Sequence, residues 1–178
     1  MSSHSFVRRK ISSVFEKILA GFTFGGSSGK QTTEQMEKFL SDANINVLHE
    51  EGVLIDNSFY LYGRPDAIKL GKGIEKRKEP SEITKDFDKS KPIIVLDHQP
   101  SQLEELSQAG VDIDFSGHTH DGQIFPINFI TDIVWENPNG YLQKGNMHSI
   151  VTSGVGVFGP NMRVLTKAEI CLVKIRFE

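Results

Sequence analysis

Three histidines lie in two short loops, and each loop directly follows an apolar run. His98 follows residues 92–96, and His118 and His120 follow residues 111–115. Neutral imidazole is the commonest side-chain metal ligand. In an extended segment His118 and His120 point to one face, because side chains alternate with a period of two. A lone histidine is more often a structural residue, but a pair spaced H-x-H beside a third histidine favours a metal site.

The two apolar runs have the pattern of buried strands, and residues 101–109 between them have the pattern of a short helix. Ser101 and Glu104 form a capping box at its start, and Gly110 stands where a helix ends. A strand, a helix and a strand at this spacing form a crossover unit, so the two strands run parallel. The three histidines then lie at the carboxyl edge of the sheet, where open α/β sheets bind ligands.

These loops resemble those of the calcineurin-like metallophosphoesterases, and more closely the bacterial branch with a G-H-T-H-x-G-Q signature. The resemblance runs from about residue 32 to the C-terminus, and its clearest segments are residues 59–66, 97–100, 117–126 and 153–160. It implies hydrolysis of phosphate esters with a pair of divalent ions, commonly manganese, iron or zinc. By this likeness His98 and His118 bind one ion and His120 binds the other.

The sequence departs from the family in its amino-terminal motifs. The D-x-H, G-D-x-x-D and G-N-H-[DE] motifs, which supply the bridging aspartate, the remaining ligands and the histidine assigned to protonate the leaving group, are absent. The segment 145–148 reads G-N-M-H, but its spacing is wrong and we expect it to belong to a strand. The chain therefore resembles the carboxyl half of a phosphoesterase, with two ions if the site is complete and one or none in this chain alone.

Four further residues are candidates for outer-shell or substrate contacts: Asp97, Asp121, Gln123 and Arg163. Asp121 places a carboxylate beside the histidine pair, as a ligand, an outer-shell partner or neither. Arg163 has the chemistry to contact a phosphate with two nitrogens, and a structural salt bridge is an equal alternative. The sequence does not assign a catalytic acid or base.

Two functions remain open. In the first, the chain is a metal-dependent phosphoesterase that hydrolyses phosphate mono- or diesters by a metal-activated hydroxide and is incomplete alone, since three neutral imidazoles cannot offset the charge of two divalent ions. In the second, it is a non-catalytic truncated or split half-domain that needs a partner chain with the missing motifs. An incomplete sheet exposes an apolar face or edge, which predicts a homo-oligomer or a complementing half as partner.

The expected fold is α/β with a mixed sheet, half of a layered sandwich in which the strand–helix–strand unit carries the histidine loops. A helix is expected at residues 33–43 and a long loop at 125–141, which holds Trp135. Further strands are expected near residues 46–49, 53–55, 59–62, 149–152 and 168–177, with a tight turn at 56–58.

The chain divides by composition into residues 1–30, an amphipathic segment with a Gly/Ser linker, and residues 31–178, the carboxyl-terminal part of the phosphoesterase domain. Apolar residues at helical spacing between 6 and 22 favour a helix that docks on the sheet over one that lies on a membrane surface. The basic run at residues 69–78 predicts a solvated loop, with a phosphate-steering patch as the alternative.

Composition sets the remaining limits. The 178 residues, with 38% hydrophobic and 24% charged content, suit one soluble globular domain. A net charge of −3 gives no electrostatic footprint for nucleic acid. The single cysteine, Cys171, excludes a disulfide framework and is expected to be a small buried hydrophobe. Without a signal peptide or an apolar run near the roughly 20 residues that span a bilayer, the expected location is the cytoplasm.

Overall fold

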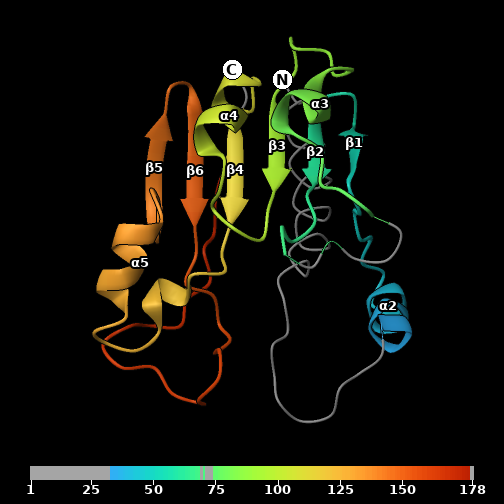
Figure 1. Ribbon diagram of the computed structural model, residues 1–178. Coiled ribbons are helices and arrows are strands. Elements are labelled where there is room, and N and C mark those ends of the chain that lie inside the picture. Colours follow the sequence, from blue (N-terminus) through green and yellow to red (C-terminus); the bar gives the residue numbers. More distant parts are fainter. Residues whose placement is uncertain (1–32, 69, 71–73, 177–178) are drawn as a thin grey trace, which may run out of the picture. The chain divides into compact units, whose positions relative to one another are not determined.

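The computed structural model describes residues 33–68, 70 and 74–176, and its elements are labelled in Figure 1. The predictions for residues 1–30 lie outside these residues, and the division at residue 31 stays a prediction. The chain forms two compact units, residues 1–47 and 48–178. In the first unit the described element is helix α2 (Thr33–Asp42), which confirms the helix predicted there.

The second unit contains a six-stranded mixed sheet in the order β1-β2-β3-β4-β6-β5. Its four central strands, β2, β3, β4 and β6, are parallel, and β1 and β5 add antiparallel edges. The bounds are β1 Glu51–Ile55, β2 Phe59–Gly63, β3 Ile93–Leu96, β4 Ile113–Ser116, β5 Gly140–Lys144 and β6 Met147–Val151. The α/β class and the mixed sheet are as the sequence predicts.

The hairpin between β1 and β2 turns where the sequence predicts it. Ile55 pairs with Phe59, and Asp56 and Asn57 between them take positive φ angles of 46° and 55°. Asp and Asn tolerate this left-handed conformation better than other residues with a Cβ, because their short polar side chains bond locally.

The crossover unit is also confirmed. Helix α4 (Leu103–Gln108) connects β3 to its parallel neighbour β4. The capping box of Ser101 and Glu104 is wrong, because the helix begins after Gln102, whose φ is 58°. The Gln102 side chain is held by tertiary contacts, accepting from Arg64 Nη2 at 2.6 Å and donating to Glu79 Oε2 at 2.9 Å.

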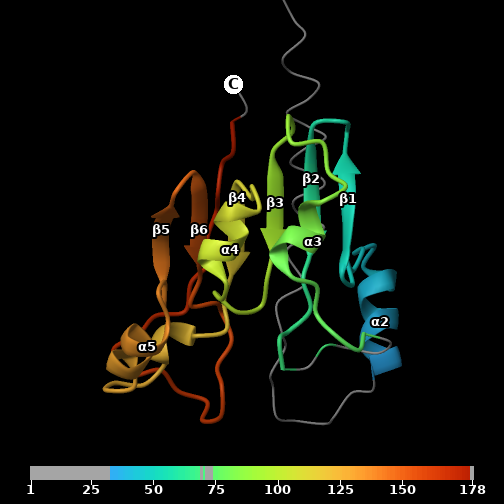
Figure 2. The same cartoon turned by 45° about the horizontal axis from the view of Figure 1, so that its top comes forward.

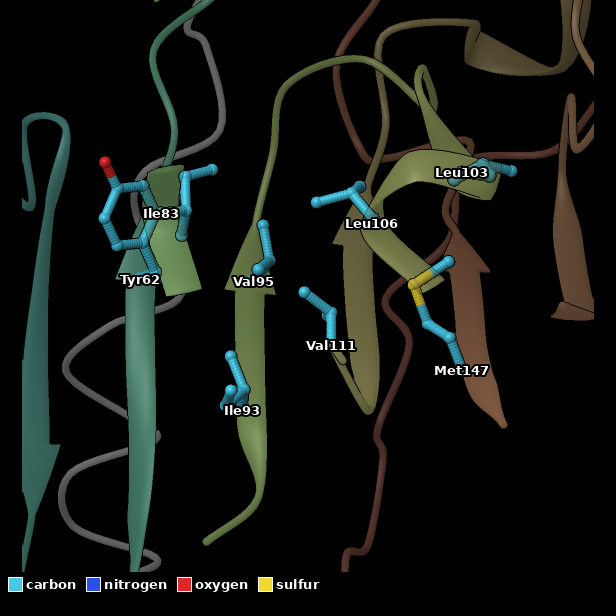
Figure 3. Close-up of a cluster of buried hydrophobic side chains, with 8 residues drawn as sticks. All are labelled: Tyr62, Ile83, Ile93, Val95, Leu103, Leu106, Val111 and Met147. Carbon is cyan, nitrogen blue, oxygen red and sulfur yellow. The ribbon is translucent and has the colours of Figure 1, made fainter. Parts of the chain in front are cut away.

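Helix α3 (Pro80–Thr84) and helix α4 cover the same face of the sheet in the two views of Figures 1 and 2. Between helices and strands lies the core that Figure 3 shows, formed by Tyr62, Ile83, Ile93, Val95, Leu103, Leu106, Val111 and Met147. Leu106 is completely buried, so the apolar stripe of the predicted helix points inward as expected. None of the helices in the described part of the chain is long and apolar enough to cross a membrane.

Two predicted strands are wrong. Residues 46–49 are irregular, since β2 ends at Gly63 opposite Glu51 and leaves earlier residues without a ladder partner. Within the described residues 168–176 there is no strand, and β6 has β4 and β5 on its two sides. Cys171 is exposed there, which corrects its predicted burial.

The segment 125–141 is not simply a loop. It contains helix α5 (Asn128–Val134), and β5 begins at Gly140. The G-N-M-H segment forms the turn into β6 and the start of that strand, so His148 belongs to a strand as predicted.

Truncation of a core leucine should lower the free energy of unfolding more than truncation of an exposed leucine. We expect Leu106→Ala to lower the free energy of unfolding by about 2–5 kcal/mol, because it removes buried methyl groups and leaves a cavity. Leu172→Ala, at a side chain that is 94% exposed, is the matched control and should change it by less than about 0.5 kcal/mol. Urea denaturation followed by circular dichroism measures both, and equal effects would contradict the assigned core.

Candidate active site

The histidine loops meet at the carboxyl edge of the parallel strands. His98 follows β3 and His118 follows β4, and their Nε2 and Nδ1 atoms are 2.9 Å apart. The Gly117 amide donates to the His98 carbonyl at 3.2 Å, so the two loops are also joined through the backbone. The parallel crossover therefore brings these two imidazoles together, as the sequence predicts.

Asp66 is a third side chain at this edge that could bind a metal ion, and the sequence analysis did not single it out. Its Oδ2 atom lies 3.4 Å from His98 Nε2, and its Oδ1 atom accepts from the Ile68 amide at 2.7 Å. Asp66 comes three residues after β2, which is parallel to β3. Sequence reasoning missed it because it treated β2 only as the second strand of a hairpin.

His120 does not join the pair in the way that its spacing predicts. His118 and His120 have φ angles of 70° and 52°, and His120 begins the 3₁₀ turn η2 (His120–Gly122). The segment is therefore not extended, and the argument from period-two alternation is wrong. His120 Nδ1 is buried without a hydrogen-bond partner. Among the described residues, no three His, Cys, Asp or Glu side chains form a group that could hold a metal ion.

The histidine pair by itself has the chemistry of two metal ligands. The 2.9 Å contact between His98 Nε2 and His118 Nδ1 is a hydrogen bond between the two rings, and it aims both nitrogens at one place, where a metal ion could take the place of the shared proton. Burial lowers the pKa of His98 and of His120, which favours the neutral form that binds metals. The pair thus fits part of a metal site, and the described donors do not complete it.

Asp97 is engaged by two cations. Its side chain is fully buried, Arg64 Nη1 donates to Oδ2 at 2.8 Å, and Arg77 Nη2 contacts the same oxygen. The backbone N–H of Gln99 donates to Asp97 Oδ1 at 3.3 Å. Asp97 therefore anchors the loop that carries His98. Arg77 is also turned inward, so this member of the basic run at 69–78 does not belong to a solvated loop.

Asp114 lies on the same buried face, one strand along. Its Oδ2 atom accepts from Ser116 Oγ at 3.1 Å and from Ser149 Oγ at 3.3 Å, while Oδ1 has no hydrogen-bond partner. Burial, and next the charge of Asp97, raise the pKa of Asp114 to about 7. It is part of the buried polar layer beneath the histidine loops.

Gln123 and Arg163 clamp a later loop onto the His120 turn. The side-chain Nε2 of Gln123 donates to the Phe158 carbonyl at 2.6 Å, and its Oε1 accepts from the backbone N–H of Phe158. Arg163 donates to four backbone carbonyls, those of His120, Ser153, Gly154 and Gly156. The sequence predicted either a phosphate contact or a salt bridge for Arg163. Instead, its guanidinium binds backbone carbonyl groups.

Asp121 and Trp135 flank the site. Asp121 has a φ of 53°, and burial, followed by the charges of Asp132 and Glu169, raises its pKa. The Trp135 ring lies 5.7 Å from that of His118, nearly perpendicular to it. An acidic residue therefore follows His120 in the chain, and an aromatic ring packs against His118.

Loss of the Asp97 charge should leave two buried guanidinium groups without their shared partner. We expect Asp97→Asn to lower the free energy of unfolding by about 3–5 kcal/mol. The matched control is Asp88→Asn, since Asp88 pairs with Lys91 at the surface and its loss should cost far less than that of Asp97. Denaturation in urea measures both variants, and a similar small loss for the two would contradict the anchoring role.

Asp114 should make stability depend on pH. Its folded pKa of about 7 lies above the roughly 3.9 of an unfolded aspartate, so the folded state holds more protons between these values. Its contribution to the unfolding free energy should fall as pH rises from about 4 to 7, by on the order of 4 kcal/mol in total. Asp114→Asn should remove this slope, and Asp56→Asn in the exposed hairpin turn should keep it. Parallel slopes for wild type and Asp114→Asn would contradict the assignment.

Comparisons with known proteins place the chain in a family. The chain is 32% identical over 140 residues to an uncharacterized metallophosphoesterase of Aquifex aeolicus, covering 78% of this chain and 53% of that protein. It is 34% identical over 145 residues to one of Campylobacter jejuni, covering 80% of this chain and 38% of that protein. It is 24% identical over 187 residues to the UDP-2,3-diacylglucosamine pyrophosphatase LpxG of Chlamydia trachomatis, covering 97% of this chain and 55% of that protein.

No family model and no solved structure matches the chain. The chain spans about half or less of the length of the curated relatives it matches. Those relatives at 30–34% identity all carry the name metallophosphoesterase and align with about 80% of this sequence. By these shared residues the chain belongs to the metallophosphoesterase family.

Proposed function

We propose that this chain takes part in the metal-dependent hydrolysis of phosphate mono- or diesters. The observation that carries the proposal is the pair of imidazole nitrogens 2.9 Å apart at the carboxyl edge of the parallel strands. This edge is where α/β sheets bind ligands, and burial keeps His98 neutral and ready to coordinate. Family membership supplies the reaction class.

His98 and His118 are the proposed ligands of one ion, with Asp66 beside them and His120 on the adjacent turn. A divalent ion at such a site polarises a phosphoryl oxygen and lowers the pKa of a bound water. The other polar residues position these groups. Asp97, held by Arg64 and Arg77, fixes the backbone at His98, and Arg163 fixes the turn at His120 through its carbonyl. Imidazole ligands suit zinc and iron better than magnesium, and manganese stays a candidate through the family.

We further propose that the chain by itself is catalytically incomplete. Two divalent ions need several carboxylates to balance their charge, and Asp97 is already neutralised by two arginines. Asp66 Oδ2 lies 3.4 Å from His98 Nε2, and Asp121 directly follows His120 in the sequence. A phosphate ester is the proposed substrate class, and the pyrophosphatase named among the relatives acts on a related phosphate linkage.

A second candidate function is a non-catalytic half-domain that works with a partner chain. The apolar segment 168–176 favours it, since Ile170 and Leu172 are 82% and 94% exposed and no strand of the described residues pairs with that segment. A partner that supplied both a strand edge and the missing carboxylates would bury this segment and complete the site.

Metal stoichiometry tests the proposal. After exposure to manganese or zinc and desalting, we expect elemental analysis to find one ion per chain, because only the His98–His118 pair is preassembled. His98→Ala and His118→Ala should each abolish retention, whereas His148→Ala, at an exposed histidine on β6, should not.

The possible outcomes separate the two candidates. One ion that depends on His98 and His118, with no turnover of bis-p-nitrophenyl phosphate, supports a site that needs a partner. Two ions with turnover would show that Asp66 and Asp121 complete the site and would overturn the incompleteness. Retention that survives both histidine substitutions, or no retention of either metal, would overturn the proposed site.

A further inference from the structure

A large apolar surface lies at the same edge of the sheet as the histidine loops. We call it the carboxyl-edge apolar surface, and its exposed side chains are Phe125, Ile127, Phe129, Ile130, Ile133, Val134, Val155, Phe158, Met162, Val164 and Leu165. They come from α5 and its flank and from the loop at residues 155–165. The two segments are joined, because Ile124 bridges Val164 and the Phe125 amide donates to the Val164 carbonyl at 3.0 Å. In Figures 1 and 2, α5 lies at the end to which the arrow of β4 points.

Helix α5 is oriented opposite to an ordinary surface helix. Its four large apolar residues, Phe129, Ile130, Ile133 and Val134, are between 57% and 85% exposed. Of its three polar residues, Asn128 and Thr131 are half-buried and Asp132 is exposed. A Cβ on Gly122 would lie 2.3 Å from Asn128 Cα, so the helix backbone is packed tightly on the histidine turn at the Asn128 side. A helix in water normally buries its apolar side, but the described residues leave the apolar side of this helix uncovered.

The surface is continuous with the site. Trp135 directly follows α5 and packs edge-on against His118. Thr119, between the two histidines, donates to the Pro138 carbonyl at 2.6 Å and so ties the segment after α5 to the histidine loop. A molecule that reaches His118 with a phosphate group therefore has the apolar surface directly beside it.

The charge of the surface argues for insertion among acyl chains and against adhesion to anionic head groups. Within residues 124–135 the only charged side chain is Asp132, and within 154–165 it is Arg163, whose guanidinium is engaged with backbone carbonyls. Apolar side chains flanked by a tryptophan are typical of helices that lie in a membrane interface.

We propose that the carboxyl-edge apolar surface inserts into the acyl layer of a lipid membrane and presents the histidine loops to phosphate esters carried by lipids. The choice of a lipid-borne substrate rests on the proposed function. The insertion itself does not, because it needs neither metal nor turnover.

The full chain with phosphatidylcholine vesicles provides the test, and Trp135, the only tryptophan, is a built-in probe. We expect the protein to float with the vesicles and brominated acyl chains to quench its fluorescence. Ile133→Asp should weaken vesicle binding by at least about tenfold, because one isoleucine no longer leaves water and a charge must enter the acyl layer instead. Leu172→Asp, at an equally exposed apolar side chain outside the surface, should bind as wild type does.

Three results would overturn the proposal. The first is wild-type protein that stays with the aqueous fraction without quenching. The second is binding that Ile133→Asp and Leu172→Asp weaken equally, or that only Phe15→Asp removes, since residues 6–22 are the alternative membrane segment. The third is a self-associated wild type that Ile133→Asp converts to monomer, which would assign the surface to a protein interface. Failure of the metal test would leave the vesicle result unchanged, so the two proposals fail separately.

Discussion

The buried carboxylate of Asp97 between two arginines is the interaction on which the arrangement of the site depends. A fully buried carboxylate is costly unless cations and hydrogen bonds compensate it, so its partners must be in place whenever the domain is folded. Arg64 directly follows β2, Arg77 comes from the long connection to β3, and Arg64 also contacts Gln102 at the start of α4. One charge therefore joins two strand ends, a loop and a helix, directly beneath His98.

The same edge of the sheet combines two kinds of order. On the β2–β3 side, charged side chains are buried and paired, and the loop that carries His98 is fixed by them. On the β4–β6 side, Arg163 and Gln123 bind backbone groups and hold the turn of His120 in a left-handed conformation. Side-chain amide and guanidinium donors satisfy backbone carbonyls that no strand or helix reaches, which keeps an irregular segment in one conformation. The histidines thus lie between two sides of the carboxyl edge, one held by buried ion pairs and the other by side chains that bind backbone groups.

The chain also exposes apolar groups in two separate places, and they have different character. The segment 168–176 forms neither helix nor strand and leaves Ile170 and Leu172 in water. Helix α5 is already folded and hydrogen-bonded, so it needs an apolar medium and not a strand edge. This difference in backbone satisfaction is why a polypeptide partner suits the first region and a lipid layer suits the second.

The sequence by itself determined the local units: the hairpin at Asp56 and Asn57, the crossover from β3 through α4 to β4, and the meeting of His98 with His118. Each follows from turn chemistry or from the parallel direction that a short crossover imposes. The tertiary structure decided what depends on distant neighbours. Asp66 reached the site because β2 is parallel to β3, and Arg163 turned to carbonyl groups that only the folded loops present. Residues 168–176 stayed out of the sheet although β1 and β5 are its outer strands. An alternating apolar pattern records the tendency to form a strand, but the folded chain decides whether that segment reaches the edge of another strand.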